Sequence, residues 1–94
     1  MTYELEFHPD AKKEWDKLDG AVKAQFKKKL AERLEQPHVP SASVSGGQNL
    51  YKIKLRTIGY RLVYKVKDKE IVVLVLSVGK RDGNIAYQKG LARK

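Results

Sequence analysis

The pattern of apolar and polar residues predicts one strand and then two helices in the first part of the chain. Residues 2–7 alternate between apolar and polar side chains, which is typical of a half-buried strand. The apolar face of this strand would consist of Tyr3, Leu5 and Phe7. Apolar residues then recur every three or four positions through residues 11–18 and 22–34, as in amphipathic helices. The link around Asp19-Gly20 is short, so we expect an antiparallel helical hairpin that ends before Pro37.

The rest of the chain predicts a loop, three more strands and a terminal helix. Residues 37–48 are rich in Pro, Ser and Gly, as in a loop. The expected strands are residues 50–56, 59–67 and 71–78. The last of these is almost wholly apolar and ends at Gly79, so it should lie inside the sheet with both faces covered. Residues 80–94 predict a short helix, with Asp82 as its candidate cap.

Composition narrows the class of protein and its location. The 94 residues show no repeat and no boundary, so residues 1–94 should form a single domain. No apolar run is long enough to span a membrane, and the N-terminus lacks the features of a secretion signal. Cysteine is absent, which fits the reducing cytoplasm. With only His8 and His38, each expected at the surface, we expect no metal site and no cofactor.

Charge is distributed unevenly along the chain. Residues 1–47 hold 8 Lys+Arg and 8 Asp+Glu, whereas residues 48–94 hold 12 and 3. The second half therefore carries the whole net charge of +9, which favours binding to a polyanion such as nucleic acid. The alternative is that the excess lysine only keeps a small protein soluble, although solubility does not require one-sided placement.

The basic residues of the two alternating strands should converge on one face of the sheet. These residues are Lys52, Lys54 and Arg56 in the first strand, and Arg61 and Lys65 in the second. An even-length hairpin loop places both apolar sets in the core and therefore both basic sets on the other face. Lys52, Lys54 and Arg61 would then lie about 5–7 Å from one another, a repulsive arrangement that a bound phosphate chain would relieve. A solvated strand face, with its cations spread into water, is the alternative.

Three stretches together resemble the RelE family of bacterial toxins: KEWDKL, YKIKLRTIGYRLVYKV and SVGKRDGNIAY. The likeness covers nearly the whole chain. It implies an α+β fold with two antiparallel N-terminal helices packed on a mainly antiparallel four-stranded sheet, and a short C-terminal helix. It also implies a function, which is cleavage of messenger RNA in the A site of the 70S ribosome. The implied partners are a RelB-like antitoxin and, through the complex with this antitoxin, operator DNA.

The resemblance also implies roles for individual residues. Lys52, Lys54 and Arg61 stand where the family holds phosphates and stabilises the transition state. Arg81 stands where phosphate is stabilised and the leaving group is protonated, and Tyr87 where the general base is proposed.

The chain departs from the family pattern at two positions. Close relatives often carry a basic residue before the loop glycine, where this chain has Ser45-Gly46. They also often carry a further arginine where this chain has Gly83. Each departure removes a phosphate contact, and neither affects the five residues with implied catalytic roles.

These residue types permit RNA cleavage without a metal. The 2′-OH of RNA can attack the adjacent phosphate if a base, a set of cations and a proton donor are in place. The basic half of the chain contains no histidine, so a tyrosine whose ionised form is favoured by nearby cations would be the base. From the sequence alone, Tyr87 could instead anchor the last helix. Lys80 and Arg81 could be surface charges, although the exit of a strand is a common place for functional side chains.

Two other functions stay open. The protein could occupy the A site, or bind nucleic acid, without cutting. It could also use its basic face only to bind an acidic antitoxin and act with this antitoxin as a repressor. An antitoxin could cover the sheet edge or displace the last helix, and the sequence does not distinguish these two modes.

Overall fold

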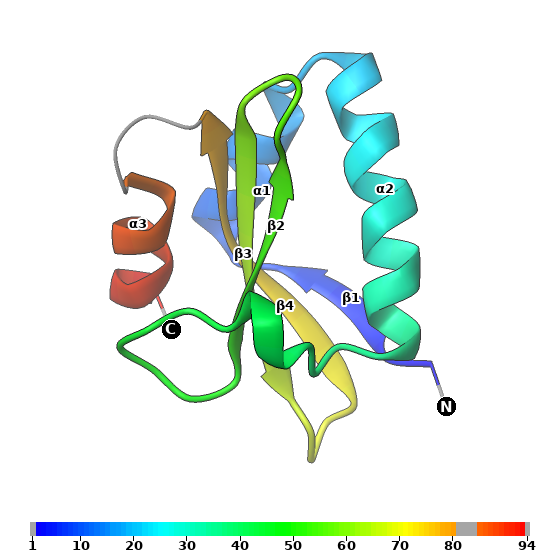
Figure 1. Ribbon diagram of the computed structural model, residues 1–94, viewed down its shortest axis with the longest axis vertical. Helices are drawn as coiled ribbons and strands as arrows, with labels where there is room; N and C mark the ends of the chain where they lie inside the picture. Colours follow the sequence, from blue (N-terminus) through cyan, green and yellow to red (C-terminus); the bar gives the residue numbers. More distant parts are fainter. Residues whose placement is uncertain (1, 81–84, 94) are drawn as a thin grey trace.

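The computed structural model describes residues 2–80 and 85–93 and contains the expected elements in the expected order (Figure 1). The elements are β1 (Glu4–Phe7), α1 (Pro9–Asp16), α2 (Gly20–Glu35), a 3-10 turn η1 (Pro40–Ala42), β2 (Leu50–Leu55), β3 (Tyr60–Lys67), β4 (Val72–Lys80) and α3 (Ile85–Arg93). The α+β fold class is confirmed. The proposed cap Asp82 lies outside the described residues.

The four strands form one mixed sheet in the order β1-β4-β3-β2. The pairs β2–β3 and β3–β4 are antiparallel, and β1 is parallel to β4. The strand β4 therefore lies between two others, which confirms the prediction from its apolar sequence. The expected end at Gly79 is wrong, because β4 continues to Lys80 and Gly79 pairs with Arg61.

A bulge in β4 allows it to fill both faces of the sheet. Val63 pairs with Ser77 and Tyr64 pairs with Val75, so Leu76 is an extra residue on β4. Leu76 belongs to the apolar cluster under α3, whereas Val75 belongs to the cluster under α1 and α2. The Ser77 hydroxyl donates a 2.6 Å hydrogen bond to the carbonyl of Ala86 on α3. Two successive residues of β4 therefore serve the α3 side of the sheet.

The two faces of the sheet carry separate cores. Helices α1 and α2 cover one face, and α3 lies on the other, on the opposite side of the ribbon (Figure 1). On the first face Trp15 lies between Phe7 and Phe26, in tilted ring contacts with centroids 5.3 and 6.1 Å away. On the second face α3 and the loop after η1 cover a smaller cluster, which consists of Val44, Leu50, Val63 and Leu76. Burial of the second cluster holds α3 on the same face as the predicted basic residues.

Local details at the first strand and helix differ from the pattern-based expectation. Leu5 is 36% exposed because β1 is an edge strand, whereas Tyr3 and Phe7 on the same face pack against the core. His8 caps α1, since its Nδ1 accepts a hydrogen bond from the backbone N–H of Asp10 at 3.1 Å. Leu18 packs against the core from beyond the end of α1.

Tyr64 connects the core of the first face to the chain that leaves α2. Its hydroxyl donates to the carbonyl of Pro37 at 2.7 Å and accepts from Nη1 of Arg33 at 2.9 Å. Burial raises the pKa of Tyr64, and the Arg33 charge only partly opposes this effect. Tyr64 is therefore a neutral structural group.

Within the described residues, no helix combines the length and the apolarity needed to cross a bilayer.

Candidate functional site

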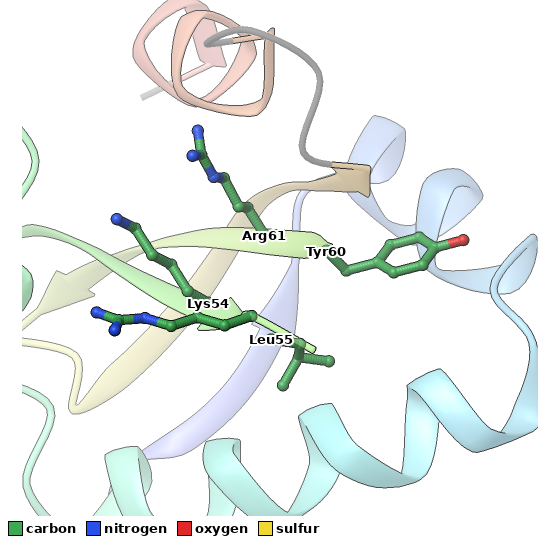
Figure 2. Close-up of a pocket in the computed structure, with 5 residues that line it drawn as sticks. Lys54, Leu55, Tyr60 and Arg61 are labelled. Carbon is green, nitrogen blue, oxygen red and sulfur yellow. The ribbon is translucent and has the colours of Figure 1, made fainter. Parts of the chain in front are cut away.

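The β2–β3 hairpin places its cations on one face of the sheet, as predicted. Four residues connect Leu55 to Tyr60, and Gly59 completes the turn with a φ of 71°. This even-length loop sets Lys54 directly opposite Arg61. Figure 2 shows Lys54 and Arg61 on the α3 side, while Leu55 and Tyr60 point away from them. The predicted register is confirmed, although Arg56 and Gly59 belong to the turn rather than to the strands.

A positively charged cavity of about 260 Å³ opens at this end of the hairpin. It is lined by Lys54, Leu55, Arg56, Tyr60 and Arg61 (Figure 2). None of these lining residues is acidic, so the field in the cavity favours an anion. Arg61 is half-buried, which positions its guanidinium more firmly than that of a freely solvated arginine. The cavity is therefore suited to a phosphate group.

Tyr87 enters the same region from α3. Its ring centroid lies 4.9 Å from Cζ of Arg61 and 5.8 Å from Nζ of Lys52, so two cations face the ring. The Tyr87 hydroxyl is buried and has no hydrogen-bond partner within residues 2–80 and 85–93. The structure thus brings Tyr87 together with the hairpin cations. We call Lys52, Lys54, Arg56 and Arg61 the basic cluster.

A second cavity, of about 330 Å³, adjoins the basic cluster at Lys52 and is also lined by Tyr87. It is lined by Ser43, Val44, Ser45, Lys52, Tyr87, Gln88 and Leu91. Ser45, the position where relatives often carry a cation, therefore faces the site with a neutral side chain. Ser43 and Gln88 were not among the predicted site residues, because a serine in a loop and a glutamine on a terminal helix carry no recognisable pattern.

Two of the predicted residues, Lys65 and Lys80, do not join the basic cluster. Lys65 pairs with Leu50 and Leu74, four positions along β3 from Arg61, or roughly 13 Å. Lys80 pairs with Tyr60 and therefore lies on the face opposite to that of Arg61. Arg81 lies outside the described residues. The predicted RNA contacts of Lys65 and Lys80 would have to be made at other points of the surface.

Close packing of α3 on the sheet holds Tyr87 beside Arg61. A side chain at Gly90 would place its Cβ only 2.8 Å from Cγ1 of Val63, so the helix approaches β3 as closely as a glycine allows. Gly46, with a φ of 98°, lies against Leu91 in the same way. These contacts leave little freedom for α3 to slide across the sheet.

The remaining histidine contacts Tyr51, which packs against the core on the opposite face of the sheet from this site. His38 Nε2 is 2.7 Å from Oδ1 of Asp68, and His38 Nδ1 is 2.9 Å from the hydroxyl of Tyr51. The hydrogen bond with His38 lowers the pKa of Asp68, and a second bond from Tyr3 adds to this effect. Within the described parts of the chain, no group of three or more His, Cys, Asp or Glu residues could hold a metal ion.

Comparisons with known proteins identify the family of the chain. Residues 5–85 match the family of the ParE toxin of type II toxin–antitoxin systems. The chain is 48% identical, over 93 residues, to the mRNA interferase toxin RelE of Escherichia coli K12. The aligned region covers 99% of this chain and 98% of the relative. A solved E. coli RelE variant in the free state matches with a TM-score of 0.91 and 47% identity over 99% and 98% of the two chains. The toxin in the E. coli RelBE toxin–antitoxin complex matches with a TM-score of 0.82 and 51% identity over 85% and 98%. The chain therefore belongs to the ParE/RelE family of toxins of type II toxin–antitoxin systems.

Proposed function

We propose that this protein is the toxin of a type II toxin–antitoxin pair and that it acts as an endoribonuclease on messenger RNA. The observation that carries this proposal is the convergence of the basic cluster with Tyr87 on one face of the sheet. The full-length identity of 48% to an mRNA interferase supports the same reaction. An RNA strand on this face would have its phosphates near Lys54 and Arg61 and a ribose near Tyr87.

The proposed reaction is an internal transfer of the phosphoryl group. The 2′-OH gives its proton to the base, its oxygen forms a bond to the adjacent phosphorus, and the bond from phosphorus to the 5′ oxygen breaks. The products are a 2′,3′-cyclic phosphate and a 5′-OH end. Lys52, Lys54 and Arg61 would stabilise the extra charge on the phosphoryl oxygens. Tyr87 would be the base, and Arg81 stays the predicted donor of the proton to the leaving oxygen.

Single-turnover cleavage tests the role of Tyr87. Tyr87→Phe removes only the hydroxyl, so we expect the rate constant to fall by at least about a hundredfold while RNA binding is unchanged. Tyr51→Phe is the matched control, because the Tyr51 hydroxyl contacts His38 away from the basic cluster. Equal rates for Tyr87→Phe and the unmodified protein would exclude Tyr87 as the base.

We further propose that cleavage depends on the ribosome. Little of an ordinary tyrosine is in its basic, ionised form at neutral pH, so the rate depends strongly on how well the 2′-OH is aligned with the phosphate, and alignment alone can supply several kcal/mol. The A site of a translating ribosome would provide this alignment. The purified toxin should therefore cut message on programmed ribosomes far faster than the same RNA in solution, and equal rates would contradict the proposal.

The expected partner is a RelB-like antitoxin that is encoded with the toxin. We propose that both proteins are located in the cytoplasm. The solved E. coli RelBE complex is the precedent for such a pair. Operator DNA would be bound through the antitoxin. A protein that acts only as a corepressor would leave message intact, so the detection of 2′,3′-cyclic ends separates this alternative from the nuclease.

A further inference from the structure

One carboxylate connects three elements at the edge of the sheet. Glu14, on α1, accepts hydrogen bonds at Oε1 from Nη1 of Arg93 (2.9 Å) and from the backbone N–H of Val78 (3.2 Å). Its Oε2 accepts from Nη2 of Arg93 (3.2 Å) and from Nζ of Lys89 (3.1 Å). Arg93 and Lys89 belong to α3, and Val78 belongs to β4. We call the paired side chains of Glu14 and Arg93 the Glu14–Arg93 bridge.

The Glu14–Arg93 bridge continues the sheet where β1 ends. β1 pairs with β4 only as far as Val75, so the next polar backbone groups on this edge of β4 have no strand partner. Glu14 accepts from the N–H of Val78, and Nη1 of Arg93 donates to the carbonyl of Leu76 at 2.9 Å. The two side chains thus take the place of a strand, and they attach the end of α3 to the β4 edge.

The environment makes this pair stronger than an ordinary surface ion pair. The side chains of Glu14 and Arg93 are only 18% and 16% exposed, and the contact is bidentate. By contrast, the pair Lys12–Asp16 on the same helix is more than half exposed at both ends. Loss of the Glu14 charge would remove the bidentate carboxylate of a partly buried guanidinium, and the other acidic neighbour of Arg93, the largely exposed Asp10, lies 3.9 Å from its Nε.

We infer that Glu14 is a positioning residue, which acts through α3 to hold the Tyr87 hydroxyl at the basic cluster. This inference rests on the proposed role of Tyr87 as the base. Tyr87 lies six residues before Arg93 on the same nine-residue helix, so a shift at the Glu14–Arg93 bridge is transmitted to the Tyr87 ring. The ring has no hydrogen bond of its own within the described residues, so the docking of α3 sets its place. Glu14 belongs to the stretch KEWDKL, which the proposed chemistry does not otherwise use.

Glu14→Gln tests the inference, since it keeps the shape of the side chain and removes its charge. We expect the single-turnover rate constant to fall by about tenfold or more, because small misplacements of reacting groups are costly. The dissociation constant for RNA should be unchanged, since the basic cluster is intact. Asp16→Asn, which removes a carboxylate from the same helix, is the matched control and should leave both quantities unchanged.

A double-variant cycle separates positioning from a general loss of structure. In the Tyr87→Phe background, Glu14→Gln should reduce the rate no further, because both changes act on the same group. An equal further loss in that background would overturn the inference. Arg93→Lys, which keeps the charge and loses the bidentate contact, should give the same pattern if Glu14→Gln folds poorly.

Fluorine NMR separates this inference from the proposed function. With 3-fluorotyrosine at the 5 tyrosines, the resonance of residue 87 is the one that disappears in Tyr87→Phe. Glu14→Gln should shift this resonance, and Asp16→Asn should not. A shift without any effect of Tyr87→Phe on the rate would support positioning and reject Tyr87 as the base. An unshifted resonance together with a slow Tyr87→Phe variant would reject positioning and leave the proposed function intact.

Discussion

The close contact between α3 and β3 predicts the effect of adding a single methyl group at Gly90. In Gly90→Ala the new Cβ would lie 2.8 Å from Cγ1 of Val63 and 3.1 Å from Cβ of Val63. Val63 is fully buried in an inner strand and has a stiff β-branched side chain, so it cannot move away easily. The helix itself must shift by about 0.6 Å to restore the shortest ordinary contact of 3.4 Å.

Two opposing effects determine how much Gly90→Ala changes the free energy of unfolding. Overpacking of this kind costs about 1–3 kcal/mol, whereas alanine is favoured over glycine in a helix by about 1 kcal/mol. We therefore expect a net loss of about 1 kcal/mol in the free energy of unfolding, measured by urea titration. Because α3 carries Tyr87, the shift should also reduce the single-turnover cleavage rate by roughly tenfold.

A compensating change makes this prediction specific. Val63→Ala removes the methyl group that collides, so the double variant should recover most of the lost rate and lose less stability than the sum of the single variants. A Gly90→Ala variant as stable and as active as the unmodified protein would refute this prediction. That result would mean that α3 does not approach β3 as closely as the structure has it.

Other perturbations test the core, the bridge and the basic cluster. Tyr64→Phe should lower the free energy of unfolding by about 2 kcal/mol in urea titration, because Arg33 and the carbonyl of Pro37 each lose a hydrogen bond. Although burial opposes ionisation of Glu14, its hydrogen bonds from Arg93, Val78 and Lys89 lower its pKa from the ordinary value of 4.5. The ionised carboxylate therefore stabilises the fold above the pKa of the unfolded chain, and this contribution is lost as pH falls through the lower folded value. Stability measured from pH 6 down to about pH 3 should fall less steeply in Glu14→Gln than in the unmodified protein, and parallel curves would contradict the assignment. A plot of the logarithm of the RNA association constant against the logarithm of the salt concentration should have a slope that is smaller by about 0.7 in Lys54→Met. An unchanged slope would mean that Lys54 does not contact a phosphate of the RNA.

The sequence was sufficient to predict the hairpin that carries the site. Lys54 and Arg61 had to face the same side, because any other register would have exposed one apolar face of a strand. The interior place of β4 followed from its unbroken run of apolar residues in the same way. Both predictions depend on local patterns that burial of apolar surface enforces.

Long-range polar contacts could not be predicted in this manner. Glu14 and Arg93 are 79 residues apart, and a glutamate on an amphipathic helix looks like ordinary polar surface until the end of β1 is known. The bulge at Leu76 could not be predicted, because every residue around it is apolar or small. This part of the chain therefore has no alternation of apolar and polar residues that a bulge would interrupt. The contact between Tyr87 and Arg61 depends on how closely α3 packs, which the spacing of residues does not specify.

The place of β4 in the sheet has a consequence for the synthesis of the protein. This strand lies next to both β1 and β3, yet it is the last strand to leave the ribosome. A nascent chain that stops before residue 72 has no partner for β1 and lacks Val73, Val75 and Val78 beneath the two helices. Cooperative folding must therefore wait until β4 has emerged from the ribosome. A toxin still under synthesis therefore has no assembled site until its last strand has joined the sheet.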